Sequence, residues 1–304
     1  MKRDIISVLD MKDDISEIID LAIKMKRDRY KSLEETKNRV LGMIFEKPST
    51  RTRISLETAM IQLGGHAIYL NPNDMQIGRG ETISDTASVI SRFLDVISYR
   101  AFKHENMVEL AKYSRVPVIN ALDNVEHPTQ ILADFMTVLE KKGRYRNLKF
   151  SYVGDGNNMA NSLMLGAALL GVDISVGCPR TNQPDREITE KAMKIAKDNG
   201  SSVEIVESPV EAVSGADIVY TDVWISMGEE SIRAEKEKLF KKYQVNDELV
   251  SNANKNYIFM HCLPAHRGLE VTESVASSIN SVIFDEAENR MHSIKSLIYT
   301  LLKY

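Results

Sequence analysis

Cysteine is scarce in this sequence: only Cys178 and Cys262 occur among 304 residues. Two cysteines exclude a disulfide framework and any zinc site with four cysteine ligands. Long apolar runs are also absent, because the longest uncharged run, residues 156–172, contains Asn, Ser and Gly and is too short and polar to span a bilayer. The N-terminal segment has no apolar stretch that would make a signal peptide. We therefore expect a cytoplasmic protein that does not enter a membrane.

An excess of basic residues is missing as well. The sequence has 39 Lys and Arg against 43 Asp and Glu, which gives a net charge of −4. Such a chain is a poor general binder of nucleic acid, and its basic stretch at residues 141–149 is typical of a solvated linker. Apolar residues make up 43% and charged residues 27%, the ordinary mixture of a globular protein, which argues against disorder. At roughly 100–200 residues per domain, the length predicts about two domains.

Short β-branched segments alternate with longer helical patterns along the chain, which predicts parallel βαβ units. The predicted strands cover residues 40–46, 66–70, 95–100, 116–122, 149–156, 173–179, 203–207, 217–223, 257–264 and 281–286. The predicted helices cover residues 51–63, 82–93, 105–113, 129–142, a segment ending at 170, 185–199 and 289–302.

A charged stretch interrupts this alternation near residue 143. We therefore expect an α/β fold with two doubly wound parallel-sheet domains, residues 1–142 and 143–288. The C-terminal helix, 289–304, is expected to pack back on the first domain. We expect the active site in the cleft between the two domains, because ligands of open parallel sheets bind at the carboxyl ends of strands.

The turn after the first predicted strand has the composition of an anion site. It reads Ser49-Thr50-Arg51-Thr52 and enters a helix, whose free N–H groups and positive dipole end attract anions. The hydroxyl groups and the planar guanidinium suit phosphate or carboxylate. The alternative is that Ser49 or Thr50 only caps the helix and that the arginine is solvated.

Further polar and cationic side chains stand at other predicted strand ends, namely Arg100, His127-Pro128-Thr129-Gln130 and Arg290 at the start of the last helix. A lone arginine is more often a surface residue, and a histidine before proline is more often a cap. Histidine can also polarise a carbonyl or act as an acid, so His127 is a candidate for catalysis.

The second half of the chain carries turns that suit a small polar ligand. The turn at residues 154–158 begins like a dinucleotide loop, but Met159 replaces the third glycine and no acidic residue ends the next strand. We therefore expect no nicotinamide cofactor. The adjacent Asn157 and Asn158 can hydrogen-bond a ligand or simply form the turn. Asp222, at the end of the strand 217–223, can bind an ammonium group or act as an N-cap.

Cys262 lies near the end of the predicted strand 257–264. It can be a nucleophile, a hydrogen-bond partner or the inert buried thiol that is usual for a free cysteine. We expect no zinc site, because His261 and Cys262 are neighbours in a predicted strand and would face opposite ways.

Together these residues describe one pocket for a phosphate-bearing anion and one for an amino acid. In this set of residues the sequence resembles the aspartate/ornithine carbamoyltransferase family. The motifs Ser-Thr-Arg-Thr at 49–52 and His-Pro-Thr-Gln at 127–130 are shared by both branches of that family. Asp222, the Ser-Met-Gly motif at 226–228 and the His-Cys-Leu-Pro motif at 261–264 resemble the ornithine branch. The match covers most of the chain in order.

The resemblance implies transfer of the carbamoyl group of carbamoyl phosphate to the side-chain amine of L-ornithine, which gives L-citrulline and phosphate in arginine metabolism. It implies no metal and no organic cofactor. The implied carbamoyl phosphate site comprises Ser49, Thr50, Arg51, Thr52, Gln76, Arg100, His127, Pro128, Thr129, Gln130, Cys262, Leu263 and Arg290.

Within that site the resemblance implies separate tasks. Thr52, Arg100 and His127 would hold the charge that develops on the carbamoyl oxygen. Ser49, Thr50, Arg51 and the helix start would hold the phosphate. Gln130 and the carbonyl groups of Cys262 and Leu263 would hold the carbamoyl NH2 group.

The implied ornithine site comprises Asn158, Asp222, Ser226 and Met227. Asn158 and the backbone of Met227 would bind the α-carboxylate, and Asp222 and Ser226 the α-amino group. Asp222 and Cys262 would orient or deprotonate the attacking amine, which must be neutral. The catalytic residues would be Arg51, Thr52, Arg100, His127, Asp222 and Cys262, and closure of the segment 226–228 would expel water.

The resemblance also implies a homotrimer or a multiple of trimers, in which Gln76 reaches the site of a neighbouring subunit. It implies neither a nucleic-acid nor a membrane partner. One alternative is a carbamoyltransferase for another amine, such as putrescine, and another is a catalytically silent relative. Asp222 and the Ser-Met-Gly motif favour a free α-amino acid. The complete set of arginines, with His127 and Cys262, argues against a silent protein.

Overall fold

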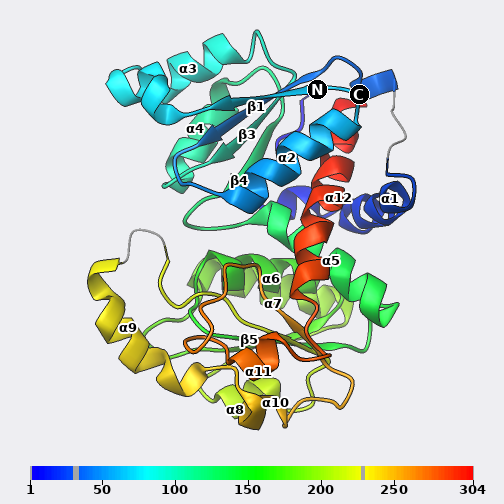
Figure 1. Ribbon diagram of the computed structural model, residues 1–304, viewed down its shortest axis with the longest axis vertical. Helices are drawn as coiled ribbons and strands as arrows, with labels where there is room; N and C mark the ends of the chain where they lie inside the picture. The colour runs from blue at the N-terminus through cyan, green and yellow to red at the C-terminus, as the bar shows by residue number, and fades with distance from the viewer. Residues whose placement is uncertain (1, 30–33, 227–229, 304) are drawn as a thin grey trace. The chain divides into compact units, whose positions relative to one another are not determined.

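The computed structural model describes residues 2–29, 34–226 and 230–303. The chain forms two compact units: unit 1 comprises Met1–Met136 and Glu288–Tyr304, and unit 2 comprises Thr137–Ala287. Each unit is built on one parallel sheet with helices against it (Figure 1). The predicted fold class, two parallel-sheet α/β domains, is confirmed. Two helices, α5 (Pro128–Lys142) and α12 (Ile283–Leu302), continue through the points at which the chain passes from one unit to the other.

The sheet of unit 1 has the strand order β2-β1-β3-β4. Its strands are β1 (Val40–Phe45), β2 (His66–Leu70), β3 (Val96–Arg100) and β4 (Val118–Leu122). Its helices are α1 (Ile15–Arg27), α2 (Thr50–Gln62), α3 (Ile83–Ile90) and α4 (His104–Tyr113), with short 3-10 turns at Val8–Met11, Glu34–Thr36, Pro72–Asp74 and Gln76–Arg79. The strand β1 is a nearly continuous apolar run and β3 is buried at every residue, because a parallel sheet is covered on both faces.

One core of unit 1 lies between the sheet and the helices α3 and α4. Ile44 and Tyr99 from neighbouring strands pack there against Met107 and Leu110 of α4. Figure 1 shows α2 and α12 on the opposite side of the sheet from α3 and α4. On that side α12 lies beside α1, where the Ser296 hydroxyl donates to a backbone carbonyl of α1 across 2.7 Å. Both faces of the sheet are thus closed, and the carboxyl ends of its strands carry the polar turns.

The sheet of unit 2 has the strand order β7-β6-β5-β8-β9. Its strands are β5 (Lys149–Val153), β6 (Asp173–Gly177), β7 (Val203–Val206), β8 (Ile218–Tyr220) and β9 (Ile258–Met260). Its helices are α6 (Asn158–Leu170), α7 (Arg186–Asn199), α8 (Pro209–Val213), α9 (Arg233–Phe240), α10 (Asp247–Val250) and α11 (Glu273–Ala276), with 3-10 turns at Glu230–Ile232 and Lys241–Tyr243.

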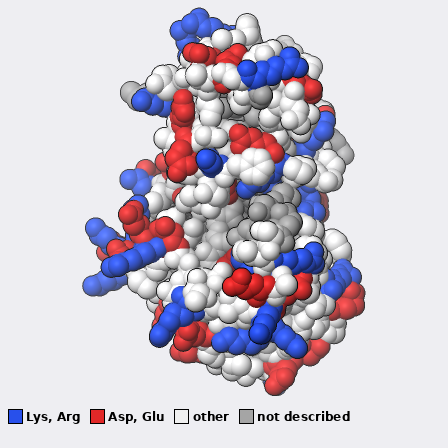
Figure 2. Space-filling view, turned by 90° about the vertical axis from the view of Figure 1, so that its left-hand side faces the viewer, with Lys and Arg blue, Asp and Glu red and all other residues white. Residues whose placement is uncertain are grey.

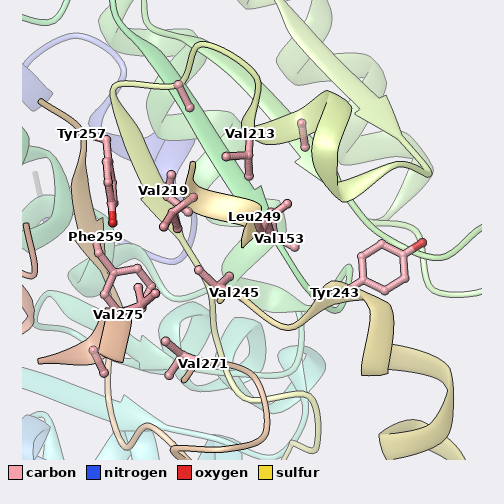
Figure 3. Packing of buried hydrophobic residues seen from close by; sticks show 14 of the residues in the cluster. Val153, Val213, Val219, Tyr243, Val245, Leu249, Tyr257, Phe259, Val271 and Val275 are labelled. Atoms are coloured by element: carbon pink, nitrogen blue, oxygen red, sulfur yellow. The ribbon is translucent and has the colours of Figure 1, made fainter. Parts of the chain in front are cut away.

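One core of unit 2 lies under the face of the sheet that carries Val153, Val219 and Phe259 (Figure 3). Val219 and Phe259 are register partners on adjacent strands, so their side chains leave the sheet on the same face. Val245 and Val271 come from the segments that cover this face. The packing holds the ends of β5, β8 and β9 in fixed positions, which matters because each is followed by a candidate site residue.

Both sheets have a point at which the strand order reverses, between β1 and β3 in unit 1 and between β5 and β8 in unit 2. At such a point the connecting segments leave in opposite directions and open a crevice at the carboxyl ends. Ser49 lies in the turn that follows β1, and Arg100 is the last residue of β3. Asp222 follows β8, and Asn158 begins α6, directly after the turn that follows β5. The topology therefore gathers the sequence motifs of each unit at one sheet edge.

The predicted strand at 281–286 is wrong. Only Ser281 makes an isolated bridge, to Phe259, and α12 begins at Ile283. The β-branched segment is too short to extend the sheet, and Asp285 and Glu286 favour the first turn of a helix. Arg290 therefore lies within α12 rather than at its start. The helix α1 was absent from the prediction, although its apolar positions form one buried stripe.

Candidate functional site

In unit 1 the start of α2 forms an anion-binding turn. Ser49 is the N-cap, and its hydroxyl accepts a hydrogen bond from the backbone N–H of Thr52 across 3.3 Å. Capping, the alternative considered for Ser49, therefore occurs, and it leaves other N–H groups of the first turn directed out of the helix. Thr50 is exposed and Arg51 is half-buried. The Nε atom of Arg51 is buried, and no group in the described ranges accepts a hydrogen bond from it.

Arg290 joins three helices of unit 1. Its Nη2 donates to the hydroxyl of Thr52 on α2 across 2.5 Å, and its Nη1 donates to Oε1 of Gln130 on α5 across 2.7 Å. The Nε2 of Gln130 in turn donates to Asp134 across 2.7 Å. All four side chains are at most 3% exposed. This network fixes the guanidinium of Arg290 beside the start of α2 and the side chain of Gln130 beside it.

His127 and Arg100 are also buried at this edge, with exposed fractions of 3% and 7%. Burial lowers the pKa of His127 well below its usual value, and the neighbouring charges of Arg290 and Arg100 lower it further. The ring is therefore a neutral imidazole. Its Nδ1 lies 3.4 Å from the hydroxyl of Thr129. Donation by that hydroxyl leaves the proton on Nε2, which can then donate a hydrogen bond.

The structure brings most of the predicted carbamoyl phosphate residues of unit 1 together but not Gln76. Pro128 begins α5 and Thr129 is fully buried beside His127. Gln76 begins a 3-10 turn, and its side chain is exposed. Only its backbone carbonyl has a described hydrogen bond, accepted from Glu81 across 3.1 Å and from Gly80. Its role in a neighbouring subunit's site stays a prediction.

In unit 2 Asp222 is the centre of a second polar group. Its Oδ1 accepts from the thiol of Cys262 across 3.0 Å, and its Oδ2 accepts from the side-chain amide of Asn157 across 3.1 Å. Asp222 is 7% exposed, whereas Cys262, Asn158 and Ser226 are half-buried. A carboxylate has about four lone-pair directions, so Asp222 keeps acceptors for a ligand N–H. Met227, predicted with Ser226, lies outside the described residues.

Asn157 has a role that the sequence analysis did not assign to it. Its Oδ1 caps α6 by accepting from the backbone N–H of Met159 across 2.9 Å, and it also accepts from the hydroxyl of Tyr152 across 3.3 Å. The bonds to Oδ1 fix the orientation of the side-chain amide, and its Nδ2 donates to Asp222. The doublet Asn157-Asn158 was the signal in the sequence, but which Asn is the cap depends on where α6 begins. Tyr152 gave no signal because it lies inside a buried strand.

The reason given against a metal site is wrong, although no metal was expected. His261, Cys262 and Asp222 each place one potential ligand atom within 4.8 Å of the others. His261 and Cys262 do not diverge because β9 ends at Met260, and Leu263 has a left-handed φ of 59° that turns the chain. The His261 ring is already engaged, however: Nδ1 accepts from the N–H of Leu263 across 2.9 Å, and Nε2 lies 3.3 Å from Glu270.

The cations at the edge of the unit 1 sheet do not form a basic surface, because Arg100 and Arg290 are buried. On the face shown in Figure 2, Lys and Arg side chains are interspersed with Asp and Glu. Among the described helices, none has the length and apolar character needed to cross a bilayer.

Two family models match the chain. The aspartate/ornithine carbamoyltransferase carbamoyl-P binding domain matches residues 3–140, and the Asp/Orn binding domain of the same family matches residues 146–301. The chain belongs to the aspartate/ornithine carbamoyltransferase family. The resemblance inferred from the four sequence motifs is thus confirmed.

Relatives align over nearly the whole chain. A catabolic ornithine carbamoyltransferase from Thermoplasma acidophilum is 68% identical over 303 residues, which cover 100% of this chain and 99% of the relative. The structure is similar to ornithine carbamoyltransferase from Pyrococcus furiosus, with a TM-score of 0.94 and 48% identity over 98% of this chain and 96% of that one. It is also similar to an anabolic ornithine carbamoyltransferase from Campylobacter jejuni, with a TM-score of 0.93 and 41% identity over 99% of both chains.

Proposed function

We propose that this protein transfers the carbamoyl group of carbamoyl phosphate to the side-chain amine of L-ornithine and releases L-citrulline and phosphate. The observation that carries the proposal is the hydrogen bond between Cys262 and Asp222 at the carboxyl edge of the unit 2 sheet. A buried carboxylate paired with a thiol donor suits a ligand amine, and the buried arginines of unit 1 suit a phosphate. The relatives are named for the same reaction class.

The residues of unit 1 would bind carbamoyl phosphate. The first turn of α2, with Ser49, Thr50 and Arg51, would hold the phosphate, because free N–H groups and a guanidinium donate to phosphate oxygens. Thr52, Arg100 and His127 would donate to the carbamoyl oxygen. Arg290 supports this set by holding Thr52 through its 2.5 Å hydrogen bond. Pro128 and Thr129 would set the position of His127, and Gln130 would accept from the carbamoyl NH2 group.

The neutral state of His127 decides how it would act. Its lowered pKa excludes an imidazolium that gives up a proton in the working pH range. A neutral Nε2–H can still donate to the oxyanion that forms when the amine attacks. Donors of this kind contribute about 3–4 kcal/mol each to transition-state stabilisation. We therefore propose that His127 stabilises charge and does not transfer a proton.

The residues of unit 2 would bind ornithine. Asp222 and the hydroxyl oxygen of Ser226 would accept hydrogen bonds from its α-amino group, and Asn158, with the backbone of Met227, would bind the α-carboxylate. The side-chain amine would lie near Cys262 and Asp222. A free alkylamine has a pKa near 10.4, so roughly one molecule in a thousand is neutral at pH 7. Asp222 and Cys262 would orient the neutral amine as it forms. The backbone carbonyl groups of Cys262 and Leu263 are proposed to contact the carbamoyl NH2 group.

The reaction balances without a cofactor. The neutral amine attacks the carbamoyl carbon, a C–N bond forms, and negative charge moves to the carbamoyl oxygen. The C–O bond to phosphate then breaks, and phosphate leaves with the bonding electrons. The nitrogen loses one proton, which the leaving phosphate can accept because it is a base. Removal of metal ions by a chelator is therefore expected to leave turnover unchanged.

The test is a colorimetric assay for ureido products with carbamoyl phosphate and a panel of amines: L-ornithine, putrescine, N-acetylornithine and L-aspartate. We expect product with L-ornithine far above the others. Faster turnover of putrescine than of L-ornithine would mean that the substrate needs no α-carboxylate. That result would overturn the proposed α-amino acid site. No product with any amine, in a folded protein that binds carbamoyl phosphate, would support a silent relative and refute the activity.

We further propose a homotrimer, or a multiple of trimers, in which Gln76 completes the phosphate site of a neighbouring subunit. Unit 1 exposes large apolar side chains that an interface could cover, including Phe93 at 73% and Ile61 at 62% exposure. The test mixes two inactive variants, Arg51→Ala and Gln76→Ala, after dissociation and reassembly. Shared sites would restore part of the activity, because some sites in a hybrid contain neither change. Unchanged inactivity, together with a monomeric mass in light scattering, would contradict the proposal.

The proposed reaction belongs to arginine metabolism, where it can run toward citrulline or toward carbamoyl phosphate. Relatives described as catabolic and as anabolic share this fold. A cytoplasmic location is proposed because Cys178 and Cys262 are both free thiols, as reducing compartments keep them.

A further inference from the structure

The helix α9 packs against the segment that carries Asp222. Trp224 follows Asp222 by two residues, and its ring stacks on Phe240 at the end of α9, with centroids 6.0 Å apart and planes at 22°. Both rings are nearly fully buried. Stacking of two buried aromatic rings restricts both elements. The C-terminal end of α9 therefore fixes where the chain runs immediately after Asp222.

One turn earlier, the same helix is tied to a second segment of the site. Lys236 Nζ lies 2.7 Å from Asp155 Oδ2, and the two side chains are only 7% and 9% exposed. The other oxygen of Asp155 accepts from the side-chain amide of Asn182 across 3.1 Å. A buried ion pair is weak as a source of stability, because both charges lose their hydration. Its geometry is nevertheless specific, since the short distance joins Nζ to one particular carboxylate oxygen.

Asp155 lies in the turn that positions Asn157 and Asn158. The carbonyl of Asp155 accepts from the hydroxyl of Tyr152 across 2.8 Å and from the N–H of Asn157 across 2.8 Å. Gly156 is packed so tightly that a Cβ there would lie 2.3 Å from the backbone of residues 183 and 184. The turn cannot shift by itself, so a displacement of Asp155 would move Asn157, which in turn holds Asp222.

We propose that Lys236 and Asp155 are positioning residues of the ornithine subsite: their ion pair couples α9 to the turn before α6 and so holds Asp222 and Asn158 in register. The inference rests on the proposed function and extends it to residues that contact no substrate. Lys236 fixes one side of the subsite through Asp155 and Asn157. Phe240, on the same helix, fixes the other side through Trp224.

The first measurement is steady-state kinetics of Lys236→Met at saturating carbamoyl phosphate. Loss of the tether should raise the KM for ornithine about tenfold or more, since misplacing substrate contacts by an ångström has effects of this size. The KM for carbamoyl phosphate should stay within about twofold. The control is Lys238→Met, an exposed lysine on the same helix, which should behave as the unaltered protein. An unchanged ornithine KM in Lys236→Met would overturn the proposal.

Two further variants separate positioning from general stability. The double variant Asp155→Asn with Lys236→Met removes both charges of the ion pair together, so the fold should survive while the tether is lost. We expect the ornithine KM to stay raised in this double variant, and Lys236→Arg to recover most of the affinity. A double variant with normal ornithine KM would show that the pair only avoids a buried lone charge, and would refute the positioning role.

Trp224 supplies a readout that does not depend on turnover, because it is the single tryptophan of the sequence. Its emission reports the contact with α9 directly. Without any substrate, Lys236→Met should shift that emission to the red relative to both the unaltered protein and Lys238→Met. Absence of citrulline synthesis in the unaltered protein would refute the proposed function, whereas an unshifted Trp224 emission in Lys236→Met would refute the coupling.

Discussion

The thiol of Cys262 and the amide of Asn157 each donate to a different oxygen of Asp222, across 3.0 Å and 3.1 Å. The two donors come from turns after β9 and β5, and Asp222 follows β8, which lies between those strands. The carboxylate is thus fixed from both sides by the order of strands in the sheet. A ligand that approaches Asp222 meets an acceptor whose orientation is set before binding.

This relationship predicts how Cys262→Ala behaves. Loss of the S–H donor should loosen Asp222 and raise the KM for ornithine, while the KM for carbamoyl phosphate changes little. A hydrogen bond to a charged group contributes about 1.5–3 kcal/mol, so we expect an effect of roughly tenfold to a hundredfold. The variant Cys262→Ser keeps a donor, so its KM for ornithine should lie between those of the unaltered protein and Cys262→Ala. If carbamoyl phosphate affinity alone changed, Cys262 would belong to the other subsite.

The phosphate site is tested by Arg51→Ala. We expect turnover to fall by orders of magnitude, on the scale of about 10²–10³ for the loss of one preorganised donor, without a change in the circular dichroism spectrum. The matched control is Arg53→Ala on the same helix, because Arg53 is exposed and stacks on Tyr69 at 3.9 Å. Citrulline synthesis by Arg51→Ala at a near-normal rate would contradict its assigned role.

The sequence was informative about the fold because burial imposes different periods on strands and helices. The run at β3 is buried at every residue, and the pattern of α7 leaves one buried stripe, so both could be recognised without a structure. The prediction of a strand at 281–286 was wrong because a run of three apolar residues is compatible both with a strand and with the start of a helix. Local pattern carries no information about which partner a segment will find.

The residues of the candidate site also fall into two groups, those that the sequence indicated and those that it did not. Ser49 and His127 could be proposed because they lie in turns, where a polar residue has no packing role to explain it. The hydrogen bond from Arg290 to Thr52 could not be foreseen, because it joins residues 238 positions apart in sequence. Lys236 gave no signal either, since a lysine in a charged helical segment is normally solvated. Its burial depends on where Asp155 lies in the fold.

His127 allows a prediction about pH. Its pKa is lowered by burial and by the charges of Arg290 and Arg100, so the ring stays neutral above its lowered pKa and its protonation cannot limit activity near neutral pH. Turnover should therefore rise with pH as more ornithine amine becomes neutral, in His127→Gln as in the unaltered protein. His127→Gln keeps an N–H donor and should retain more activity than His127→Ala. If the rise of turnover at the low-pH end of the profile disappeared in His127→Gln alone, the imidazole of His127 would titrate in that pH range, contrary to the prediction.

Glu126 allows a prediction about stability. This residue precedes His127, is 4% exposed, and accepts a hydrogen bond from the N–H of Val8 across 2.8 Å. Burial raises its pKa from 4.5 to about 7, against the opposing effects of hydrogen bonds from Ser7 and Val8. The folded protein therefore holds a proton on Glu126 between these two values, whereas the unfolded chain has lost it.

The sign of the effect follows from proton linkage. Because the folded state binds the extra proton, the free energy of unfolding should fall as pH rises from about 5 to 7, by on the order of 3 kcal/mol from this residue. Glu126→Gln keeps a carbonyl oxygen to accept from Val8 but cannot ionise, so it should remove that part of the slope and be more stable than the unaltered protein at pH 8. The measurement is urea unfolding at pH 5, 6.5 and 8 and at one protein concentration, with Glu105→Gln as the exposed control. Equal slopes in Glu126→Gln and the unaltered protein would show that Glu126 stays ionised in the folded state.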